Sequence, residues 1–495
     1  MYYPPLEDFL RLTKKGNVIP VYKEMNADLD TPVSAFLKIE KNNDYAFLLE
    51  SVEGQEKLAR YSFLGVNPSL IFKSKGRSIE IVSPQKKTGK KFLTDLSPLD
   101  EIKKIMFKFK SVSLPGLPRF YGGLVGFIGY DMVRFFERLP DKNPDDLKTP
   151  DAVLMLMDTL LIFDHVKHTI KIVSNVILPD KANISLPEKT KCYKNALSMI
   201  DKVSSLLGHP LSEYKGLTKG LNLKPRSNYT KAQFENVVKD AKVHIKKGDI
   251  IQVVPSQRFE LKTNKDAFTI YRTLRSLNPS PYMFLLKLKE FDLVGASPEM
   301  LVRCEDGIVE TRPIAGTRPR GKDKAEDIRL AAQLLKDKKE RAEHLMLVDL
   351  GRNDLGRISK IGSVKVTEFM NVEKYSHVMH LVSEVKGRLD NSRYDIYDVL
   401  KAAFPAGTVT GSPKIRAMEI IDDLENTRRG PYAGCVGYFS FSHNMDTCIT
   451  IRTILIKGNT AYVQAGGGIV ADSRPAKEYA ETVNKAKALI EAIKQ

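Results

Sequence analysis

Four glutamates in the sequence have the spacing of neighbours on a helix face. Glu340 and Glu343 are three residues apart, and Glu478 and Glu481 repeat this spacing near the C-terminus. Because residues three apart lie on one side of a helix, two such helices can hold a hard cation between them. Mg²⁺ prefers oxygen ligands and often takes one or two carboxylates together with an anionic substrate. A single pair is more often a solvated face with ion pairs, so the metal interpretation depends on the neighbouring motifs.

Two other segments contain groups that bind carboxylates well. Residues 311–320 hold three arginines around a predicted turn at Gly316 and Thr317. The backbone N–H groups and the hydroxyl of such a turn can hold a carboxylate, although a basic surface loop explains the composition equally well. Arg452 follows an apolar run, and we predict a strand there from which the planar guanidinium points inward to recognise a carboxylate.

Three consecutive glycines stand between apolar residues: Gly466, Gly467 and Gly468. Such a run predicts either a β-bulge or bare backbone that approaches an anion. Two histidines, His377 and His380, are also three residues apart, so a transition-metal site with nearby carboxylates is an alternative. The HExxH motif is absent, and we favour His380 alone as a proton-transfer group.

The composition is that of an ordinary soluble protein. The 495 residues are 42% hydrophobic and 28% charged, which allows two or three domains with a large core. No apolar run reaches the ~18 residues needed to span a bilayer, and the first residues lack a signal-peptide pattern. The four cysteines have no CxxC spacing, which predicts free thiols and a cytoplasmic location.

The net charge of +18 comes from 78 basic and 60 acidic residues. It indicates either a nucleic-acid partner or an anionic small substrate. The lysines are interspersed with acidic residues and no nucleic-acid motif is present, so we predict a solvated surface with a local anion site. The chain also has no Trp, although it has 22 Phe and 19 Tyr. Drift of composition explains this, or the protein must be made when tryptophan is scarce.

Hydrophobic periodicity predicts alternating short strands and helices along the chain. One long apolar strand is expected at residues 153–163, and a polar segment at 208–228 is interpreted as a linker. After the linker, Thr230 and Gln233 form a predicted capping box at the start of a helix. A buried strand is then expected at residues 250–254.

Several motifs occur in an order that resembles the chorismate-utilising enzymes. Together they extend over about residues 226–490. They are Pro313–Arg318, Ala342–Asp349, Arg352–Arg357, Gly407–Thr408 with Gly411–Lys414, and the glycine run with Glu481. The resemblance implies an α+β fold with a large antiparallel β-sandwich-like core flanked by helices.

The N-terminal half is similar to the anthranilate-forming branch of this family. Leu48–Ser51 and Pro281–Met283 resemble the tryptophan feedback site of that branch. The resemblance implies a regulatory, tryptophan-binding region at residues 1–215 and a chorismate-binding catalytic region at 216–495. Tryptophan would bind as an inhibitor, although the apolar residues of these motifs would also pack in an ordinary core. The implied inhibitor-binding residues are Ser51, Pro281, Tyr282 and Met283.

Two positions separate the branches of the family. Isochorismate-forming relatives carry Lys where this chain has Gln252, and an amide cannot activate water as that amine does, so ammonia is the expected nucleophile. Aminodeoxychorismate-forming relatives commonly carry a Lys at the position of Ala315, but some lack it, so this folate-pathway activity remains the alternative. The tryptophan-site motifs and the missing Trp favour conversion of chorismate and ammonia into anthranilate and pyruvate, the first step of tryptophan biosynthesis.

The resemblance also implies a role for each candidate residue. Mg²⁺ on Glu343 and Glu481 would bind the ring carboxylate of chorismate, with Glu340 and Glu478 as further or water-mediated ligands. The other carboxylate would meet an arginine, a tyrosine and bare backbone, while a Gly-Thr pair positions the ring. These substrate-binding residues are Arg452, Tyr432, Gly466, Gly467, Gly468, Gly316 and Thr317.

The implied catalytic residues are His380, Thr408 and Gln252. Of these, His380 is expected to help the ring hydroxyl depart. Free ammonia is scarce at neutral pH, and the chain has no room for a glutaminase module. The resemblance therefore implies a partner, a glutamine amidotransferase subunit.

Overall fold

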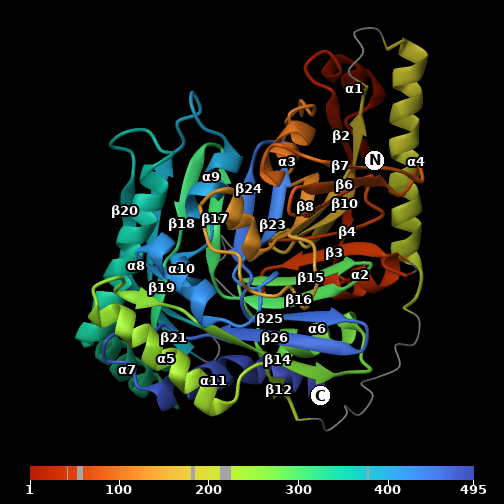
Figure 1. The fold of residues 1–495 in the computed structure, drawn as a ribbon. Coiled ribbons are helices and arrows are strands. Elements are labelled where there is room, and N and C mark those ends of the chain that lie inside the picture. The colour runs from red at the N-terminus through yellow and green to blue at the C-terminus, as the bar shows by residue number, and fades with distance from the viewer. Residues whose placement is uncertain (42, 53–59, 180–183, 212–223, 376–377) are drawn as a thin grey trace.

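The computed structural model describes residues 1–495 apart from 42, 53–59, 180–183, 212–223 and 376–377 (Figure 1). Two large antiparallel sheets lie face to face at its centre, with helices outside them. The first sheet has the strand order β1 (Tyr2–Tyr3), β2 (Val18–Asn26), β11 (Thr169–Ile177), β10 (Thr159–Asp164), β4 (Tyr61–Val66), β3 (Tyr45–Glu50), β15 (Tyr282–Leu288), β16 (Asp292–Ser297), β25 (Thr453–Lys457), β26 (Thr460–Gly466), β14 (Ser256–Lys262) and β12 (Arg226–Ser227).

The second sheet faces the first. Its strand order is β19 (Ile314–Pro319), β21 (Val378–Arg388), β18 (Ile308–Thr311), β17 (Met300–Glu305), β24 (Met445–Ile449), β23 (Cys435–Ser440), β8 (Gly123–Ile128), β9 (Ala152–Met157), β5 (Leu70–Lys75), β6 (Ser78–Ser83) and β7 (Thr88–Leu93), and β20 (Lys365–Lys374) also pairs with β21. A small separate sheet joins β13 (Gln252–Val253) to β22 (Gly411–Ser412).

Alternating side chains along each central strand build the core between the sheets and the cores beneath the helices. On β15, Phe284 and Leu286 pack between the two sheets, whereas Met283 and Leu285 pack under the helices of the first sheet. This follows from the period of two along a strand. A strand buried on both faces reads as a continuous apolar run, which is the pattern of β15.

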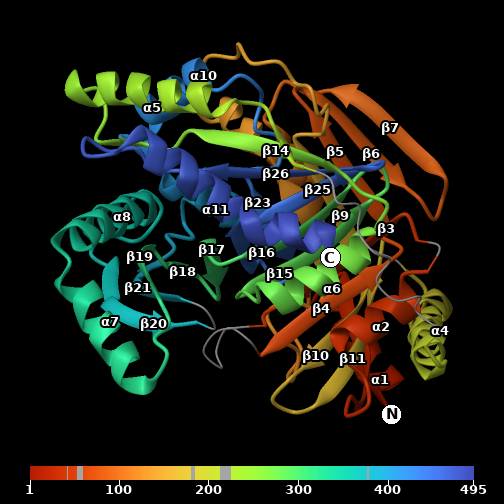
Figure 2. The same cartoon turned by 90° about the horizontal axis from the view of Figure 1, so that it is seen from below.

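Helices cover the outer faces of both sheets (Figure 2). The first sheet is covered by α2 (Pro32–Ile39), α4 (Leu186–Gly208), α6 (Ala267–Leu277) and α11 (Pro475–Lys494), and α11 also packs on α5 (Lys231–Lys246). The second sheet is covered by α8 (Lys338–Gly356) and α9 (Ile396–Ala403), with α3 (Pro98–Met106) beside α9. The remaining helices are α1 (Leu6–Leu12), η1 (Tyr130–Phe135), α7 (Lys324–Lys336), η2 (Gly407–Val409) and α10 (Lys414–Leu424). The predicted α+β sandwich flanked by helices is thus confirmed.

Within the described residues, none of these helices combines the length and the apolar character that a membrane span requires.

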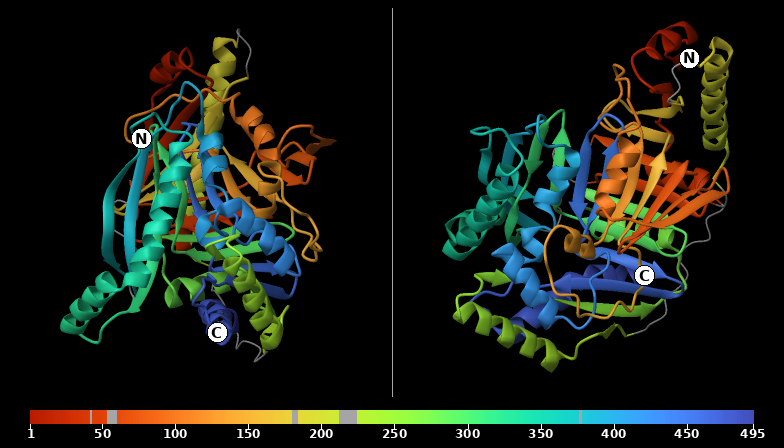
Figure 3. Two further views of the ribbon diagram at one scale, coloured as in Figure 1. Left: turned by 60° about the vertical axis from the view of Figure 1, so that its left-hand side comes forward. Right: turned by 45° about the horizontal axis from the view of Figure 1, so that its top comes forward.

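The helices α7 and α8 and the strands β19, β20 and β21 lie at one end of the molecule, far from α4 (Figure 3). At this end α8 packs against β19 and β21, and α7 packs against β19. The carboxylates of α8 are therefore presented from the end of the second sheet, while those of α11 come from the helix layer on the first sheet.

Both sheets draw strands from both sides of residue 215. In the first sheet β3 pairs with β15, with Glu50 opposite Met283, and in the second β8 pairs with β23, with Phe127 opposite Val436. The division at residues 215 and 216 stays a prediction about function, because the two regions share their sheets.

Two predicted strands differ from the structure. Residues 153–163 form two strands, β9 and β10, which belong to different sheets and are joined at Asp158. Both strands are apolar and buried on both faces, so the pattern did not show where the chain changes sheets. The predicted strand at 250–254 is reduced to β13, because Ile251 is 63% exposed. The predicted capping box at Thr230 is confirmed at the start of α5.

Candidate active site

Local contacts turn the glutamates of α8 toward the interior. Asp337 caps the helix by accepting hydrogen bonds from the backbone N–H groups of Lys339 and Glu340. One turn later the fully buried His344 lies with Nε2 2.6 Å from the Ser383 hydroxyl of β21. This buried contact fixes the rotation of α8 about its own axis. The neighbouring Glu343 then faces Gln252 of β13.

The carboxylates of α8 and α11 meet at one place. Burial raises the pKa of Glu343, and the charges of Glu340 and Glu481 raise it further. Burial also raises the pKa of Glu478, again with a contribution from Glu481. Glu343 of α8 therefore lies within electrostatic range of Glu481 of α11, which is also within range of Glu478. Glu481 is half exposed and lies 2.7 Å from Lys485 Nζ.

The donor set fits a hard divalent cation that brings its own waters. In the described part of the chain, no three His, Cys, Asp or Glu side chains form a ready metal cage. Mg²⁺ does not require one, since one or two carboxylates and an anionic substrate complete its shell. The raised pKa of Glu343 and of Glu478 reflects buried like charges, which a bound cation would stabilise in their ionised form.

Gln252 joins the glycine run to the carboxylates. Its Nε2 lies 3.5 Å from Glu343 Oε1. On the other side it lies against Gly468, where a Cβ would come within 2.5 Å of Nε2. Only glycine leaves room for the amide at this position, so the glycine run sets where Gln252 reaches.

The tyrosine hydroxyl predicted at the substrate site lies beside the same run. A Cβ on Gly466 would be 2.8 Å from the Tyr432 Oη, and burial raises the pKa of Tyr432 to about 12. Lys485 Nζ donates to the Gly466 carbonyl at 3.0 Å. The Gly467 N–H donates to the Pro255 carbonyl at 3.2 Å, so this particular backbone donor is already used within the protein.

Arg452 lies in the site, but the predicted strand around it is wrong. The residue stands between β24 and β25 with φ of +50°, in the left-handed region. Its Nη1 donates to the Lys485 carbonyl at 2.6 Å, and burial lowers its pKa while the nearby Tyr432 and Glu481 raise it. A turn, rather than a period-two strand, therefore aims the guanidinium at the cluster.

His380, Gly316 and Thr317 come together across β19 and β21. The Nδ1–H of His380 donates to the Gly316 carbonyl at 2.9 Å, and Nδ1 lies 3.1 Å from the Thr317 hydroxyl. Burial lowers the pKa of His380, and the charge of Arg452 lowers it further. The ring is therefore neutral with its proton on Nδ1, and no described residue forms a hydrogen bond with Nε2, which is the acceptor nitrogen. His377, the other half of the alternative metal pair, lies outside the described residues.

The arginines of residues 311–320 are committed to ion pairs within the protein. Arg312 pairs with Glu373 at 2.6 Å, and Arg318 pairs with Asp337 at 2.7 Å. Arg320 binds its own partner, an aspartate of α7, at 2.7 Å. The segment is a bulged strand with Gly316 at φ of +67°, and its contribution to the site comes from backbone and hydroxyl groups.

Glu299 is a site residue that the sequence analysis missed. It lies buried between β16 and β17, and burial raises its pKa to about 8, although the Thr408 hydroxyl and Lys485 act in the opposite direction. Glu299 and Thr408 line one cavity beside α8. The feature of the sequence that could have indicated Glu299 is a single carboxylate between two apolar segments. At neutral pH it is a protonated acid, which makes it a candidate proton donor.

The predicted inhibitor residues line a second cavity between the two sheets. Its walls are formed by apolar side chains, and its polar groups include Arg119, which donates to Asp446 at 3.2 Å. Tyr282 Oη also donates to Asp446, at 3.0 Å. The structure brings Ser51, Pro281, Tyr282 and Met283 together here with Leu49, Glu50, Tyr61, Phe63, Arg119, Phe284, Val436, Gly437, Tyr438, Asp446 and Cys448.

Comparisons with known proteins agree with this architecture. Residues 45–491 match the model of a family described as chorismate binding enzyme. The chain is 48% identical over 498 residues to anthranilate synthase component 1 of Acetivibrio thermocellus, covering all of this chain and 99% of that protein. It is 50% identical over 489 residues to the protein of the same name from Aquifex aeolicus, covering 99% of this chain and 97% of that one.

Solved structures have the same fold. The crystal structure of anthranilate synthase component I from Streptococcus pneumoniae superimposes with a TM-score of 0.78 at 37% identity, covering 94% of this chain and 98% of that one. The menaquinone-specific isochorismate synthase of Escherichia coli superimposes with a TM-score of 0.71 over 99% of both chains. At 19% identity, this second likeness bears on the fold alone.

The unusual pKa of Glu299 predicts a stability difference that depends on pH. Because its pKa is raised to about 8 in the folded chain from 4.5, the wild-type protein loses stability relative to Glu299→Gln as pH rises between these values, by up to about 1.4 kcal/mol for each pH unit. Thermal melts of both proteins at pH 5, 6, 7 and 8 measure this difference. A melting-temperature difference that does not change with pH would show that Glu299 has an ordinary pKa.

Proposed function

The chain belongs to the chorismate-binding enzymes, and from this premise we propose that it converts chorismate and ammonia into anthranilate, pyruvate and water. The observation that favours ammonia over water as nucleophile is the neutral amide of Gln252 beside Glu343. An amide has no basic lone pair with which to deprotonate water. Full-length relatives at 43–50% identity are named anthranilate synthase component 1, which favours this activity over the aminodeoxychorismate alternative.

The two carboxylates of chorismate meet opposite ends of the site. Glu343 and Glu481 would hold Mg²⁺, which supplies a Lewis acid and a template for the ring carboxylate. The Arg452 guanidinium would bind the enolpyruvyl carboxylate, with the Tyr432 hydroxyl beside it. The charge of Glu481 raises the pKa of the buried Arg452, so the site has a cation for one carboxylate of the substrate close to a carboxylate that would hold the metal for the other.

Proton transfers then fall to two groups with opposite properties. Glu299 is protonated at neutral pH, so it donates its proton to the ring hydroxyl, which leaves as water when ammonia bonds to the ring carbon next to the carboxylate-bearing one and the ring double bonds shift. His380 is neutral and uses Nδ1 as its donor, so its Nε2 accepts the ring proton whose loss drives elimination of pyruvate and makes the ring aromatic. The role first predicted for His380, help to the departing hydroxyl, thus passes in this proposal to Glu299.

Ammonia has to come from elsewhere at neutral pH. The relatives are named component 1, and we propose that a glutamine amidotransferase subunit supplies ammonia to this chain. All four cysteines are free thiols, in keeping with the reducing cytoplasm in which such a complex would work.

The direct test supplies ammonia without the partner. We expect the purified chain to produce the fluorescence of anthranilate when chorismate, Mg²⁺ and ammonium are mixed above pH 8, where more ammonia is unprotonated. Omitting ammonium is the control, and product identity is confirmed by mass spectrometry. Isochorismate or aminodeoxychorismate as the product would refute the proposed activity.

Removing one carboxylate tests the metal assignment. We expect Glu481→Gln to lose Mg²⁺-dependent turnover and the rise in melting temperature that Mg²⁺ and chorismate cause together, because the cation loses a charged ligand. Glu491→Gln, on the same helix but in a pair with Lys494, is the matched control and keeps both. Unchanged turnover and an unchanged melting shift in Glu481→Gln would remove Glu481 from the metal site.

We further propose that tryptophan inhibits the enzyme from the cavity between the sheets. The apolar wall there includes Phe63, Phe284 and Val436, which suit an indole, and Arg119, which also lines the cavity, suits the carboxylate of an amino acid. Accumulated tryptophan would thus reduce its own synthesis by feedback inhibition.

The strand β24 passes from this cavity to the active site. Asp446 and Cys448 line the inhibitor cavity. The next residue, Ile449, donates its N–H to the Glu299 carbonyl at 3.0 Å, and the strand ends just before the turn that contains Arg452. A shift of β24 on tryptophan binding would therefore reach Glu299 and Arg452 directly. Couplings of this kind are worth about 1–3 kcal/mol.

Filling the inhibitor cavity separates regulation from catalysis. We expect Ser51→Phe to keep anthranilate formation and to lose tryptophan inhibition, since the added ring occupies the cavity. Binding is measured by the fluorescence of added tryptophan, because the protein has no Trp of its own. Ser78→Phe at the start of β6, which does not line the cavity, is the control. A Ser51→Phe protein that remains fully tryptophan-sensitive would refute the assignment.

A further inference from the structure

A fully buried ion pair lies behind the active site. The side chain of Arg429 is 2% exposed and that of Glu425 is 4% exposed, and their Nη2 and Oε1 atoms are 2.6 Å apart. A second contact joins Nε to Oε2 at 3.0 Å. Burial lowers the pKa of Arg429, but the charge and hydrogen bond of Glu425 together with Tyr130 and Tyr432 outweigh it, so the pKa is raised and the guanidinium stays charged.

The remaining donors of Arg429 bind the segments that carry two catalytic candidates. Nη1 donates to the Val409 carbonyl at 2.7 Å, and Val409 directly follows Thr408 in η2. Nη2 donates to the Val254 carbonyl at 2.7 Å, two residues after Gln252. One planar group therefore sets the separation of the turn with Thr408 from the strand with Gln252.

The faces of the guanidinium are also occupied. Its Cζ lies 5.5 Å from the ring centre of Tyr432 and 4.8 Å from that of Tyr130. These are distances at which a cation is attracted to an aromatic face. Arg429 thus supports the tyrosine whose hydroxyl lies beside Gly466.

Glu425 extends the same linkage to the glycine run. Its Oε1 accepts hydrogen bonds from both the backbone N–H and the hydroxyl of Ser256, each at 2.8 Å. The Ser256 hydroxyl in turn accepts from Gln464 Nε2 at 2.8 Å, and Gln464 stands two residues before Gly466 on β26. The acid therefore connects β14 and β26 to the arginine.

We propose that Arg429 and Glu425 are a positioning pair, which touches no substrate but fixes Thr408, Gln252, Tyr432 and the end of β26 relative to one another. The proposal rests on the function proposed above for these residues. Stability alone does not explain a buried ion pair, since well-packed apolar residues often stabilise a core as well or better. What the pair adds is fixed hydrogen-bond geometry. The planar guanidinium donates in set directions that the ammonium of a lysine cannot reproduce.

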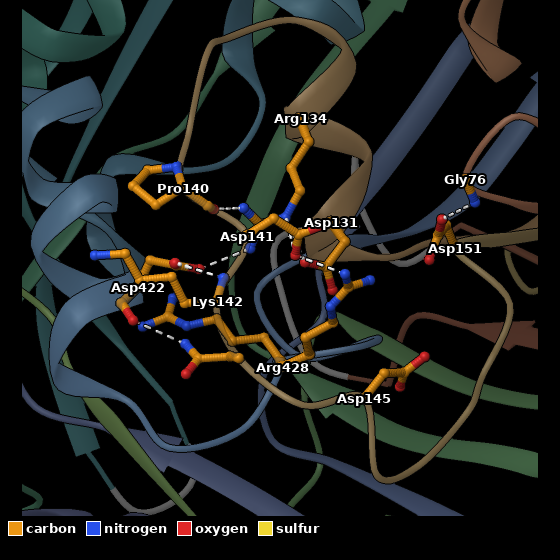
Figure 4. Close-up of polar contacts among 12 residues, drawn as sticks. Gly76, Asp131, Arg134, Pro140, Asp141, Lys142, Asp145, Asp151, Asp422 and Arg428 are labelled. Carbon is orange, nitrogen blue, oxygen red and sulfur yellow. Dashed lines mark hydrogen bonds and ion pairs between the residues drawn. The ribbon is translucent and has the colours of Figure 1, made fainter.

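A neighbouring arginine provides a matched control. Arg134 donates to Asp131 at 3.0 Å, to Asp422 of α10 at 2.8 Å and to the Pro140 carbonyl. Figure 4 shows Arg134 among Asp131, Pro140 and Asp422. The network ties α10 to η1 and the loop after it, and it reaches neither Thr408 nor Gln252.

The experiment compares Arg429→Lys, Arg429→Gln and Glu425→Gln with Arg134→Gln and the wild-type chain. For the three variants of the pair we expect kcat for anthranilate, with ammonium as donor, to fall by a factor of about 100, because small misplacements of catalytic groups have effects of this size. Tryptophan affinity, read by ligand fluorescence, should change less than about twofold. Arg134→Gln should keep both its kcat and its tryptophan affinity, even where its melting temperature falls.

Each possible result decides the question. Arg429→Lys with wild-type kcat shows that a charge is enough and overturns the positioning role. Variants that lose tryptophan binding and activity together, or that do not fold, show a purely structural role and also overturn it. A wild-type chain that makes no anthranilate refutes the proposed function instead, so the two failures are distinguishable.

Discussion

Carboxylates of like charge gathered from two helices are the constraint on which the active site depends. Glu343 comes from a helix on the second sheet and Glu481 from a helix on the first, and the charge of Glu481 adds to the burial that raises the pKa of Glu343. Such an arrangement persists only where folding is driven by other contacts. The buried contact of His344 with Ser383 and the packing of α11 on β26 are contacts of that kind.

The sandwich explains how one chain accommodates two sites. Each sheet joins a block of strands from the N-terminal half to a block from the C-terminal half, and the cavity between the sheets and the cavity beside α8 both lie against strands of the second sheet. β24 contributes to both, and it lies between β17 and β23 in the middle of the second sheet. A central strand cannot move without its neighbours, because their hydrogen bonds run along its whole length. Regulation through such a strand would therefore act on the whole site at once.

The sequence predicted those features that depend on neighbouring residues and failed for those that depend on distant contacts. The glutamate spacing is a property of one helix, so both pairs were found, and the Thr230 capping box was confirmed for the same reason. The single strand expected at residues 153–163 failed because an apolar run looks the same in either sheet. The strand expected at Arg452 failed because a left-handed turn has no period. Glu299 was missed since its raised pKa comes from burial by distant segments.

The proposed nucleophile follows from the lack of a basic side chain at position 252. A lysine at position 252 would place an amine beside Glu343, where it would pair with that carboxylate when charged and offer a base to water when neutral. The amide of Gln252 does neither: it donates one weak hydrogen bond at 3.5 Å and remains neutral. Gly468 and, through Val254, the buried Arg429 hold it in place. A neutral amide beside Glu343 suits a neutral nucleophile such as the ammonia of the proposed reaction.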